Sequence, residues 1–357
     1  RPSTPKDKDN DGFGACLLIM DDNHWLIEWI AYHHFVLPLT HLVVLADPNS
    51  RTSSKVVLDR WENDIHISMW NDTQLDMPDN PYEMFGIVRA PSGEEKVGGG
   101  SKHRARQLFF YNRCIKSFKN MPGGPKWLIL TDTDEFARIN FEANAVSNVN
   151  GPSFSLAQYG AVSKFLNHEE QTRSGAFPKC IQAPRMQYGS KNTISSDKLN
   201  STTFPELPHI NTGKDLLTTR WNYRRKNIMA LGKNIFNLAL MEQGDVPDKP
   251  DTDSVHSVIK NICPTHKKTR PLTHEDSLLV VHHYAGTQEQ FYFRQDPRSN
   301  KGRASFQKSN KGTTFFDDSM TTWLDGFAKK YGPDQASLLL EGVGNVTYSP
   351  IRKKRGV

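Results

Sequence analysis

The hydrophobic pattern of the first 135 residues alternates between short apolar runs and stretches with helical periodicity. Four short apolar runs predict strands, at about 15–20, 42–45, 65–70 and 127–130. Three helical patterns lie between them, at about 24–36, 53–62 and 102–118. This alternation predicts an α/β protein with parallel strands, in which ligands bind beyond the carboxyl ends of the strands.

The second half of the chain has a looser pattern, which predicts a mixed sheet. We expect short strands near 153–157, 178–187 and 278–284, a basic surface loop over 296–313 and an amphipathic helix over 317–331. The chain is therefore expected to form one domain over 14–335, with a disordered segment before it (1–13) and a tail after it (336–357).

The most informative segment is the apolar run 127–130 followed by Thr-Asp-Thr-Asp-Glu-Phe. Asp132 and Asp134 are two residues apart, so an extended chain places both carboxylates on one face of the strand end. Carboxylate oxygens suit a hard divalent cation, which in turn holds a diphosphate. The alternative is a turn whose carboxylates are only solvated. Glu135 is expected to point to the other face as a structural neighbour.

Composition narrows the class of protein. Hydrophobic residues make up 36% of the 357 residues, which is enough for an enzyme-sized core. Lys and Arg number 45 against 39 Asp and Glu, a net charge of +6. This mild excess fits anionic ligands and does not require nucleic acid. The chain begins with Arg1, so we expect a preceding segment that carries a signal or membrane anchor.

Three N-glycosylation sequons begin at Asn71, Asn200 and Asn345, which indicates the secretory pathway. The four cysteines are widely spaced and form no Cys-x-x-Cys motif, so zinc and redox motifs are not expected. They are either four buried thiols or two disulfides with three possible pairings.

Three blocks of the sequence resemble glycosyltransferase family 92. The first is Asp-Asp-Asn-His-Trp-Leu-Ile-Glu-Trp-Ile-Ala-Tyr-His at 21–33, followed by the strand that ends in Asp-Pro-Asn-Ser at 47–50. The second is 107–114 with the acidic segment at 127–136, and the third is Val-His-His-Tyr-Ala-Gly-Thr-Gln-Glu-Gln-Phe at 281–291. The departure is Asp-Asp at the start of the first block, where the family commonly has Asn-Glu.

The resemblance implies a GT-A-like, Rossmann-type mixed sheet flanked by helices. It implies a nucleotide-sugar-binding half (14–140), an acceptor half (141–295), and a basic loop with a C-terminal helix (296–335). It further implies a UDP-sugar donor, a glycan acceptor, and a type II membrane protein of the Golgi lumen whose anchor precedes this sequence. Known members include inverting β-galactosyltransferases, so UDP-galactose is the expected donor.

The resemblance also implies roles for single residues. Mn²⁺ or Mg²⁺ would be held by Asp132, Asp134 and His283, while His282 would face the opposite way on its strand. Donor-binding candidates at the strand ends and on the third helix are Asp22, Asp47, Arg106, Gln107 and Asp132. An inverting transfer needs a carboxylate base. The candidates are Glu169 and Glu170 first, with Asp197, Glu206 and Glu275 left open. No acceptor-binding residue is assigned.

Two other functions compete with a metal-dependent glycosyltransferase. A phosphohydrolase with Asp132 as nucleophile would carry Thr or Val two residues after the second aspartate, where this chain has Phe136. A catalytically silent glycan-binding protein on a transferase fold is the second alternative. The presence of Asp132, Asp134 and His283 argues against this silent protein.

Overall fold

The structure is a computed structural model that describes residues 11–78, 99–143, 153–189, 204–252, 254–263, 277–293, 306–307 and 310–346. The strands are β1 (Phe13–Ile19), β2 (Leu39–Ala46), β3 (His66–Trp70), β4 (Trp127–Leu130), β5 (Glu135–Ile139), β6 (Cys180–Tyr188), β7 (Tyr223–Arg225), β8 (Met229–Asn237), β9 (Leu279–Tyr284) and β10 (Thr313–Phe316). The helices are α1 (Asn23–Val36), α2 (Lys55–Leu58), α3 (Gly99–Lys119), α5 (Ala161–Thr172), α7 (Leu217–Arg220), α8 (Gln288–Phe293), α10 (Trp323–Tyr331) and α11 (Pro333–Leu339).

The strands form one mixed sheet in the order β10-β7-β6-β8-β4-β1-β2-β3, and β9 joins β5 to β6. The first strands, β1, β2, β3 and β4, run parallel, so their carboxyl ends share one edge of the sheet. β8 pairs antiparallel with both β4 and β6 and so connects the two halves of the sheet. The predicted α/β class, a mixed sheet flanked by helices, is confirmed.

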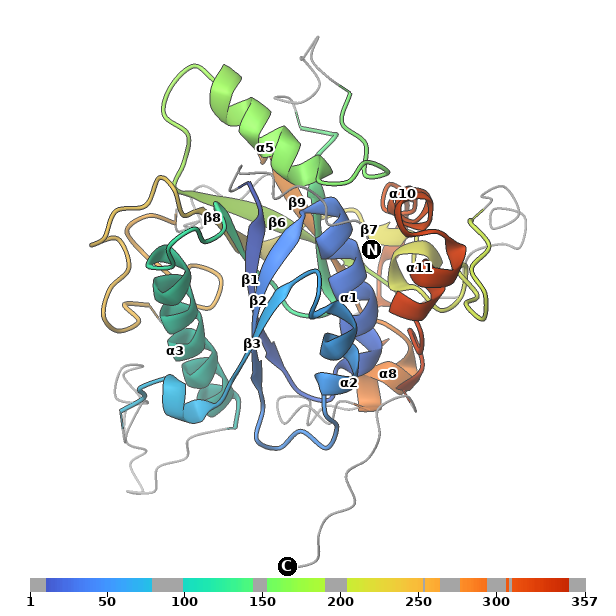
Figure 1. Cartoon of the computed structure of the whole chain (residues 1–357), viewed down its shortest axis with the longest axis horizontal. Coiled ribbons are helices and arrows are strands. Elements are labelled where there is room, and N and C mark those ends of the chain that lie inside the picture. Colours follow the sequence, from blue (N-terminus) through green and yellow to red (C-terminus); the bar gives the residue numbers. More distant parts are fainter. Residues whose placement is uncertain are drawn as a thin grey trace, which may run out of the picture.

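The helices α1 and α3 lie on opposite faces of the parallel strands (Figure 1). Every residue of α1 is buried, because α10 packs against its outer side while the sheet covers its inner side. Two side chains on α1 donate hydrogen bonds to backbone carbonyls of β5: Trp29 Nε1 to Glu135 (3.0 Å) and Tyr32 Oη to Ala137 (2.8 Å). These bonds hold α1 against β5, the strand that follows the acidic turn.

Both disulfides are formed between distant elements. Cys16 on β1 is bonded to Cys114 on α3, and Cys180 on β6 is bonded to Cys263. The first fastens α3 to the parallel strands, and the second fastens the segment 254–263 to the antiparallel half. Of the two cysteine states left open by the sequence, the disulfide state is the one found.

Several predicted elements differ from those observed. The helix expected over 53–62 is only the short α2 followed by a 3₁₀ turn at Asp59–Trp61. The strand expected near 153–157 is absent, because Phe154 packs on Phe165 of α5 instead of joining a ladder. Residues 336–346, expected to begin a tail, pack on the core through Leu339, Leu340 and Val343.

The C-terminal amphipathic helix is confirmed as α10, although it begins only at Trp323. The basic loop over 296–313 and the segment 1–13 lie largely outside the described residues. Among the helices that the structure describes, none combines the length and the apolar character that a membrane span needs.

Candidate metal and nucleotide site

The acidic turn lies between β4 and β5, at the carboxyl edge of the parallel strands. The antiparallel pairing of β5 with β9 sets Glu135 directly opposite His283. As a result, His283 Nε2 lies 3.5 Å from Asp134 Oδ2, although the two residues are far apart in sequence. Ligand atoms of Asp134, Glu135 and His283 all lie within 4.8 Å of one another.

The ring of His283 is oriented by Gln187 on β6. The amide nitrogen of Gln187 donates to the carbonyls of Tyr188 and His283, which fixes its Oε1 as the acceptor at 2.9 Å from His283 Nδ1. Nδ1 must therefore carry a proton. In a neutral ring, Nε2 then directs a lone pair at the Asp134 carboxylate. Two acceptors that face each other at 3.5 Å need either a proton or a cation between them.

Glu135 is fully buried, and both of its oxygens already have cationic partners. Oε1 lies 3.1 Å from Arg185, and Oε2 lies 2.7 Å from Lys233 Nζ and accepts from the backbone N–H of Asp132 at 2.9 Å. Its carboxylate therefore stabilises the turn through these contacts. The expectation that Glu135 points to the other face is wrong, because it shares a face with His283.

Asp132 is held from two sides. Lys233 Nζ lies 2.9 Å from its Oδ2, and Gln107 Nε2 on α3 lies 3.4 Å from its Oδ1. Its side chain is 31% exposed, against 13% for Asp134. Asp134 thus faces His283, while Asp132 points toward β8 and α3 from a more open position.

Lys233 is the cation that joins the two acidic residues. It is almost fully buried on β8. Burial alone would lower the pKa of its ammonium, but the carboxylates of Asp132 and Glu135 outweigh it and raise the pKa above the usual value. Lys233 therefore stays charged at neutral pH and compensates the two acids that the turn brings into the interior.

The donor-side candidates Asp47 and Arg106 contact each other at the end of β2. Arg106 Nη1 lies 3.2 Å from Asp47 Oδ2, and Nη2 donates to the carbonyl of Ala46 at 2.9 Å. A third partner is Asp72, whose carboxylate accepts from Arg106 Nε at 2.7 Å. Arg106, a donor-binding candidate on α3, thus connects the helix to the strand edge through two aspartates.

The side chains of the aspartate pair at the end of β1 accept hydrogen bonds within the loops at the carboxyl edge. Asp21 adopts a left-handed backbone conformation (φ 57°) and accepts hydrogen bonds from both Arg51 and Thr52. The donor candidate Asp22 is buried and accepts from the backbone N–H of Met20 at 3.1 Å. Both side chains therefore shape the loop at the carboxyl edge, beside the strand ends.

The two glutamates expected to supply a base lie away from this edge. Glu169 and Glu170 are on the helix α5. The carboxylate of Glu170 pairs with Lys126 (2.8 Å) and Asn237 (3.1 Å), and Lys126 directly precedes β4. This is the opposite end of β4 from the acidic turn, so the assignment of a base to these residues does not fit the geometry.

The sequence interpretation missed Lys233 and the supporting pair Arg185 and Gln187. The sequence did contain an indication for Lys233, because it is the single lysine in the otherwise strand-like run 229–237. A lysine in such a run is buried only when it has an acidic partner. The sequence did not show which acid that partner is.

Comparison with known proteins finds no matching family model and no matching curated protein. Among solved structures, the chain is similar to residues 1–349 of S. aureus TarS, with 10% identity, 89% of this chain and 72% of that chain covered, and a TM-score of 0.33. It is also similar to apo mouse xyloside xylosyltransferase 1, with 9% identity, 90% and 83% covered, and a TM-score of 0.30. Similarity at this level carries no argument about function.

The fold and the site together define a class. This is an α/β protein with an Asp–His pair and a charge-compensated acidic turn at the carboxyl edge of its parallel strands. That edge is the place where ligands bind in open α/β sheets.

Proposed function

We propose that this protein is a metal-dependent glycosyltransferase that uses a nucleotide-sugar donor. Within this proposal the donor is a UDP-sugar, with UDP-galactose tested first, and the sugar passes to a glycan acceptor with inversion to a β-linkage. The sequence resemblance to glycosyltransferase family 92 supports the class, and the geometry of the acidic turn supports the metal.

The observation that carries the proposal is the pair Asp134 and His283. A carboxylate and an imidazole lone pair, 3.5 Å apart and held by Gln187, form two ligands aimed at one point. Mg²⁺ commonly binds through one or two carboxylates and completes its shell with water and substrate phosphates. Imidazole also suits Mn²⁺. This donor set therefore fits a metal ion that binds together with a diphosphate.

Each residue of the turn then has a role. Asp134 and His283 would hold the ion, which acts as a Lewis acid toward the charge on the leaving diphosphate. Lys233 and Arg185 hold the carboxylate of Glu135 and so stabilise the turn. Asp132, more exposed than Asp134, lies where it can accept from the ribose or from metal-bound water.

The test measures nucleotide release from a panel of UDP- and GDP-sugars, with Mn²⁺ or with EDTA. Release should depend on Mn²⁺, and Asp134→Asn and His283→Ala should each reduce it about 100-fold or more, as expected when a Lewis acid is lost. Matched controls are Asp248→Asn and His66→Ala, which change an exposed aspartate and an exposed histidine on other elements. Both controls should keep the wild-type rate.

Absence of release from every donor, with pooled glycans present, would argue for the silent glycan-binding protein. Binding of glycans without any metal-dependent nucleotide binding would then be expected. Release that persists in EDTA would instead contradict the metal assignment and leave the transferase class standing.

We propose further that the protein is a type II membrane protein of the Golgi lumen, as the resemblance to glycosyltransferase family 92 implies. The two disulfides support an oxidising compartment. Asn71 is exposed, and its Oδ1 accepts from the backbone N–H (3.0 Å) and hydroxyl (2.6 Å) of Thr73, the third residue of its sequon. Expression in a secretory host should add a glycan there that peptide N-glycosidase removes and Thr73→Ala abolishes. An unmodified Asn71 would count against this location.

A further inference from the structure

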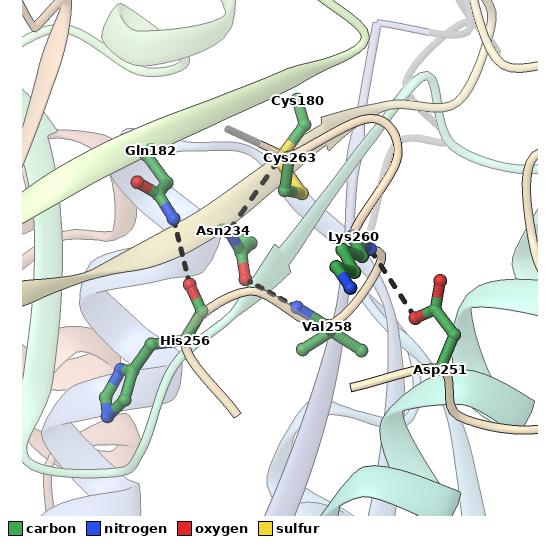
Figure 2. Close-up of a disulfide and its surroundings, with 8 residues drawn as sticks. All are labelled: Cys180, Gln182, Asn234, Asp251, His256, Val258, Lys260 and Cys263. Atoms are coloured by element: carbon green, nitrogen blue, oxygen red, sulfur yellow. Dashed lines mark hydrogen bonds between the residues drawn. A yellow bond between two sulfur atoms is a disulfide. The ribbon is translucent and has the colours of Figure 1, made fainter. Parts of the chain in front are cut away.

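The segment 254–263 is fastened to the sheet beside the candidate site. The disulfide Cys180–Cys263 holds its end on β6 (Figure 2). Two further contacts attach the segment to the sheet. Gln182 Nε2 on β6 donates to the carbonyl of His256 at 3.0 Å, and the backbone N–H of Val258 lies 3.5 Å from Asn234 Oδ1 on β8 (Figure 2). His256 is thus fixed through its backbone by a neighbouring strand.

The tautomer of His256 follows from its single ring contact. Nδ1 lies 2.9 Å from the carbonyl oxygen of Gly232, which can only accept, so Nδ1 carries the proton. Burial, together with the charges of Lys233 and Arg185, lowers the pKa of His256 to about 3, so the ring is neutral. Nε2 therefore presents a lone pair, and among the described residues no donor is bonded to it.

The ring of His256 lies beside the charged residues around the acidic turn, because it contacts the carbonyl of Gly232. Gly232 directly precedes Lys233, whose ammonium lies 2.9 Å from Asp132 and 2.7 Å from Glu135. His256 is half-buried at this point, so its ring borders the site and remains partly open to solvent. A neutral hydrogen-bond acceptor beside cations and carboxylates matches a ligand that brings a hydroxyl group.

We infer that His256 Nε2 accepts a hydrogen bond from a sugar hydroxyl of the substrate, and that the Cys180–Cys263 disulfide positions His256 for this contact. The inference rests on the proposed transferase function and adds a specificity-determining residue to it. The hydroxyl belongs either to the sugar of the donor or to the glycan acceptor.

Two substitutions separate this role from a structural one. His256→Asn keeps a donor toward the Gly232 carbonyl and removes the Nε2 acceptor, whereas His256→Gln places an amide oxygen near the Nε2 position. Titration calorimetry with Mn²⁺ compares UDP with UDP-galactose, or with the donor that the panel identifies. If the hydroxyl is on the donor, His256→Asn should weaken UDP-sugar binding about 3- to 10-fold, leave UDP unchanged, and be partly rescued by His256→Gln.

If the hydroxyl is on the acceptor, both binding constants stay at wild-type values. The concentration of pooled glycans that gives half-maximal nucleotide release then rises by a similar factor. Wild-type values of all three quantities in His256→Asn would overturn the inference while leaving the transferase intact. A wild-type protein that binds no UDP or UDP-sugar would overturn both.

The disulfide is tested against its counterpart in the same chain. The double variant Cys180→Ala/Cys263→Ala should reproduce the sugar-specific loss of His256→Asn, whereas Cys16→Ala/Cys114→Ala should lower stability alone. An equal effect of both pairs on sugar binding would refute the positioning role. If the first pair fails to fold, the comparison of His256→Asn with His256→Gln still decides the contact itself.

Discussion

The substitution Lys233→Met tests how much the buried ion pairs of Lys233 stabilise the acidic turn. Lys233 is 2% exposed at its side chain and contacts Asp132 at 2.9 Å and Glu135 at 2.7 Å. Methionine has a similar length and leaves both carboxylates without this cation. Glu135 keeps only Arg185 as a charged partner, at 3.1 Å.

The loss of unfolding free energy expected for Lys233→Met can be estimated from these distances. At an effective dielectric constant of about 20, each of the two ion pairs contributes roughly 6 kcal/mol of Coulomb attraction. Much of this attraction is offset by the cost of removing the ammonium from water. The measured cost of breaking one buried pair by removing a partner is about 3–5 kcal/mol. Because Glu135 is fully buried and Arg185 compensates only part of its charge, we expect Lys233→Met to fall in this range.

Urea unfolding at pH 7, with the disulfides intact, measures this cost as a change in the free energy of unfolding. The matched control is Lys179→Met. Lys179 also pairs with two carboxylates, Glu242 at 3.0 Å and Asp245 at 2.8 Å, but its side chain is 31% exposed. Solvent screens those pairs, so the control should lose no more than about 1 kcal/mol.

A double-mutant cycle gives the decisive comparison. Lys233→Met/Glu135→Gln removes the uncompensated charge together with its partner, so it should be less destabilised than the sum of the two single variants by about 1–3 kcal/mol. If Lys233→Met costs no more than Lys179→Met, or if the cycle gives no coupling between the two positions, Lys233 does not stabilise the acidic turn through Glu135.

Three further predictions test other parts of the structure. Gln187→Ala should weaken Mn²⁺ binding about 10- to 100-fold, because the partner that orients His283 is lost, and calorimetry with Mn²⁺ and UDP measures this. Burial raises the pKa of Glu28 to about 7, although three hydrogen bonds act to lower it. The contribution of Glu28 to stability is therefore full below about pH 4.5 and is lost as the pH rises through 7. The urea midpoint of the wild-type protein should fall over this range, and that of Glu28→Gln, measured between pH 4 and 8, should not show this fall. Cys16→Ala/Cys114→Ala opens a crosslink that spans 98 residues and should cost about 2–5 kcal/mol in urea unfolding at pH 7.

The parallel half of the fold was predictable because its pattern is local. The apolar runs that became β1, β2 and β4 are short and bounded by polar residues, and strand–helix alternation implies their direction. The acidic turn was predictable from the same pattern, because Asp132 lies two residues after the end of an apolar run. The boundaries of these strands were less well predicted, since β1 begins at Phe13 and β2 at Leu39.

The antiparallel half was not predictable in the same way. A hydrophobic run indicates that a strand is buried, but not which strand it pairs with. The pairing of β8 with β4 and β6 brings Lys233 to Asp132 and Glu135, and no local signal in the sequence indicates these pairings. The assignment of the catalytic base to Glu169 or Glu170 does not fit the structure for the same reason. The charge of a residue does not indicate the end of the sheet at which it lies.

The two adjacent histidines of β9 show how pairing register decides the site. His283 faces Asp134, whereas His282 is buried on the other face, where Arg138 Nε donates to its Nε2 at 2.7 Å and Tyr188 lies 3.1 Å from the same atom. A slip of one residue would exchange the two faces and place both rings in the wrong surroundings. Arg138 is buried and donates to His282 across the ladder in the observed register. This buried pair on the other face therefore favours the register that brings His283 to Asp134.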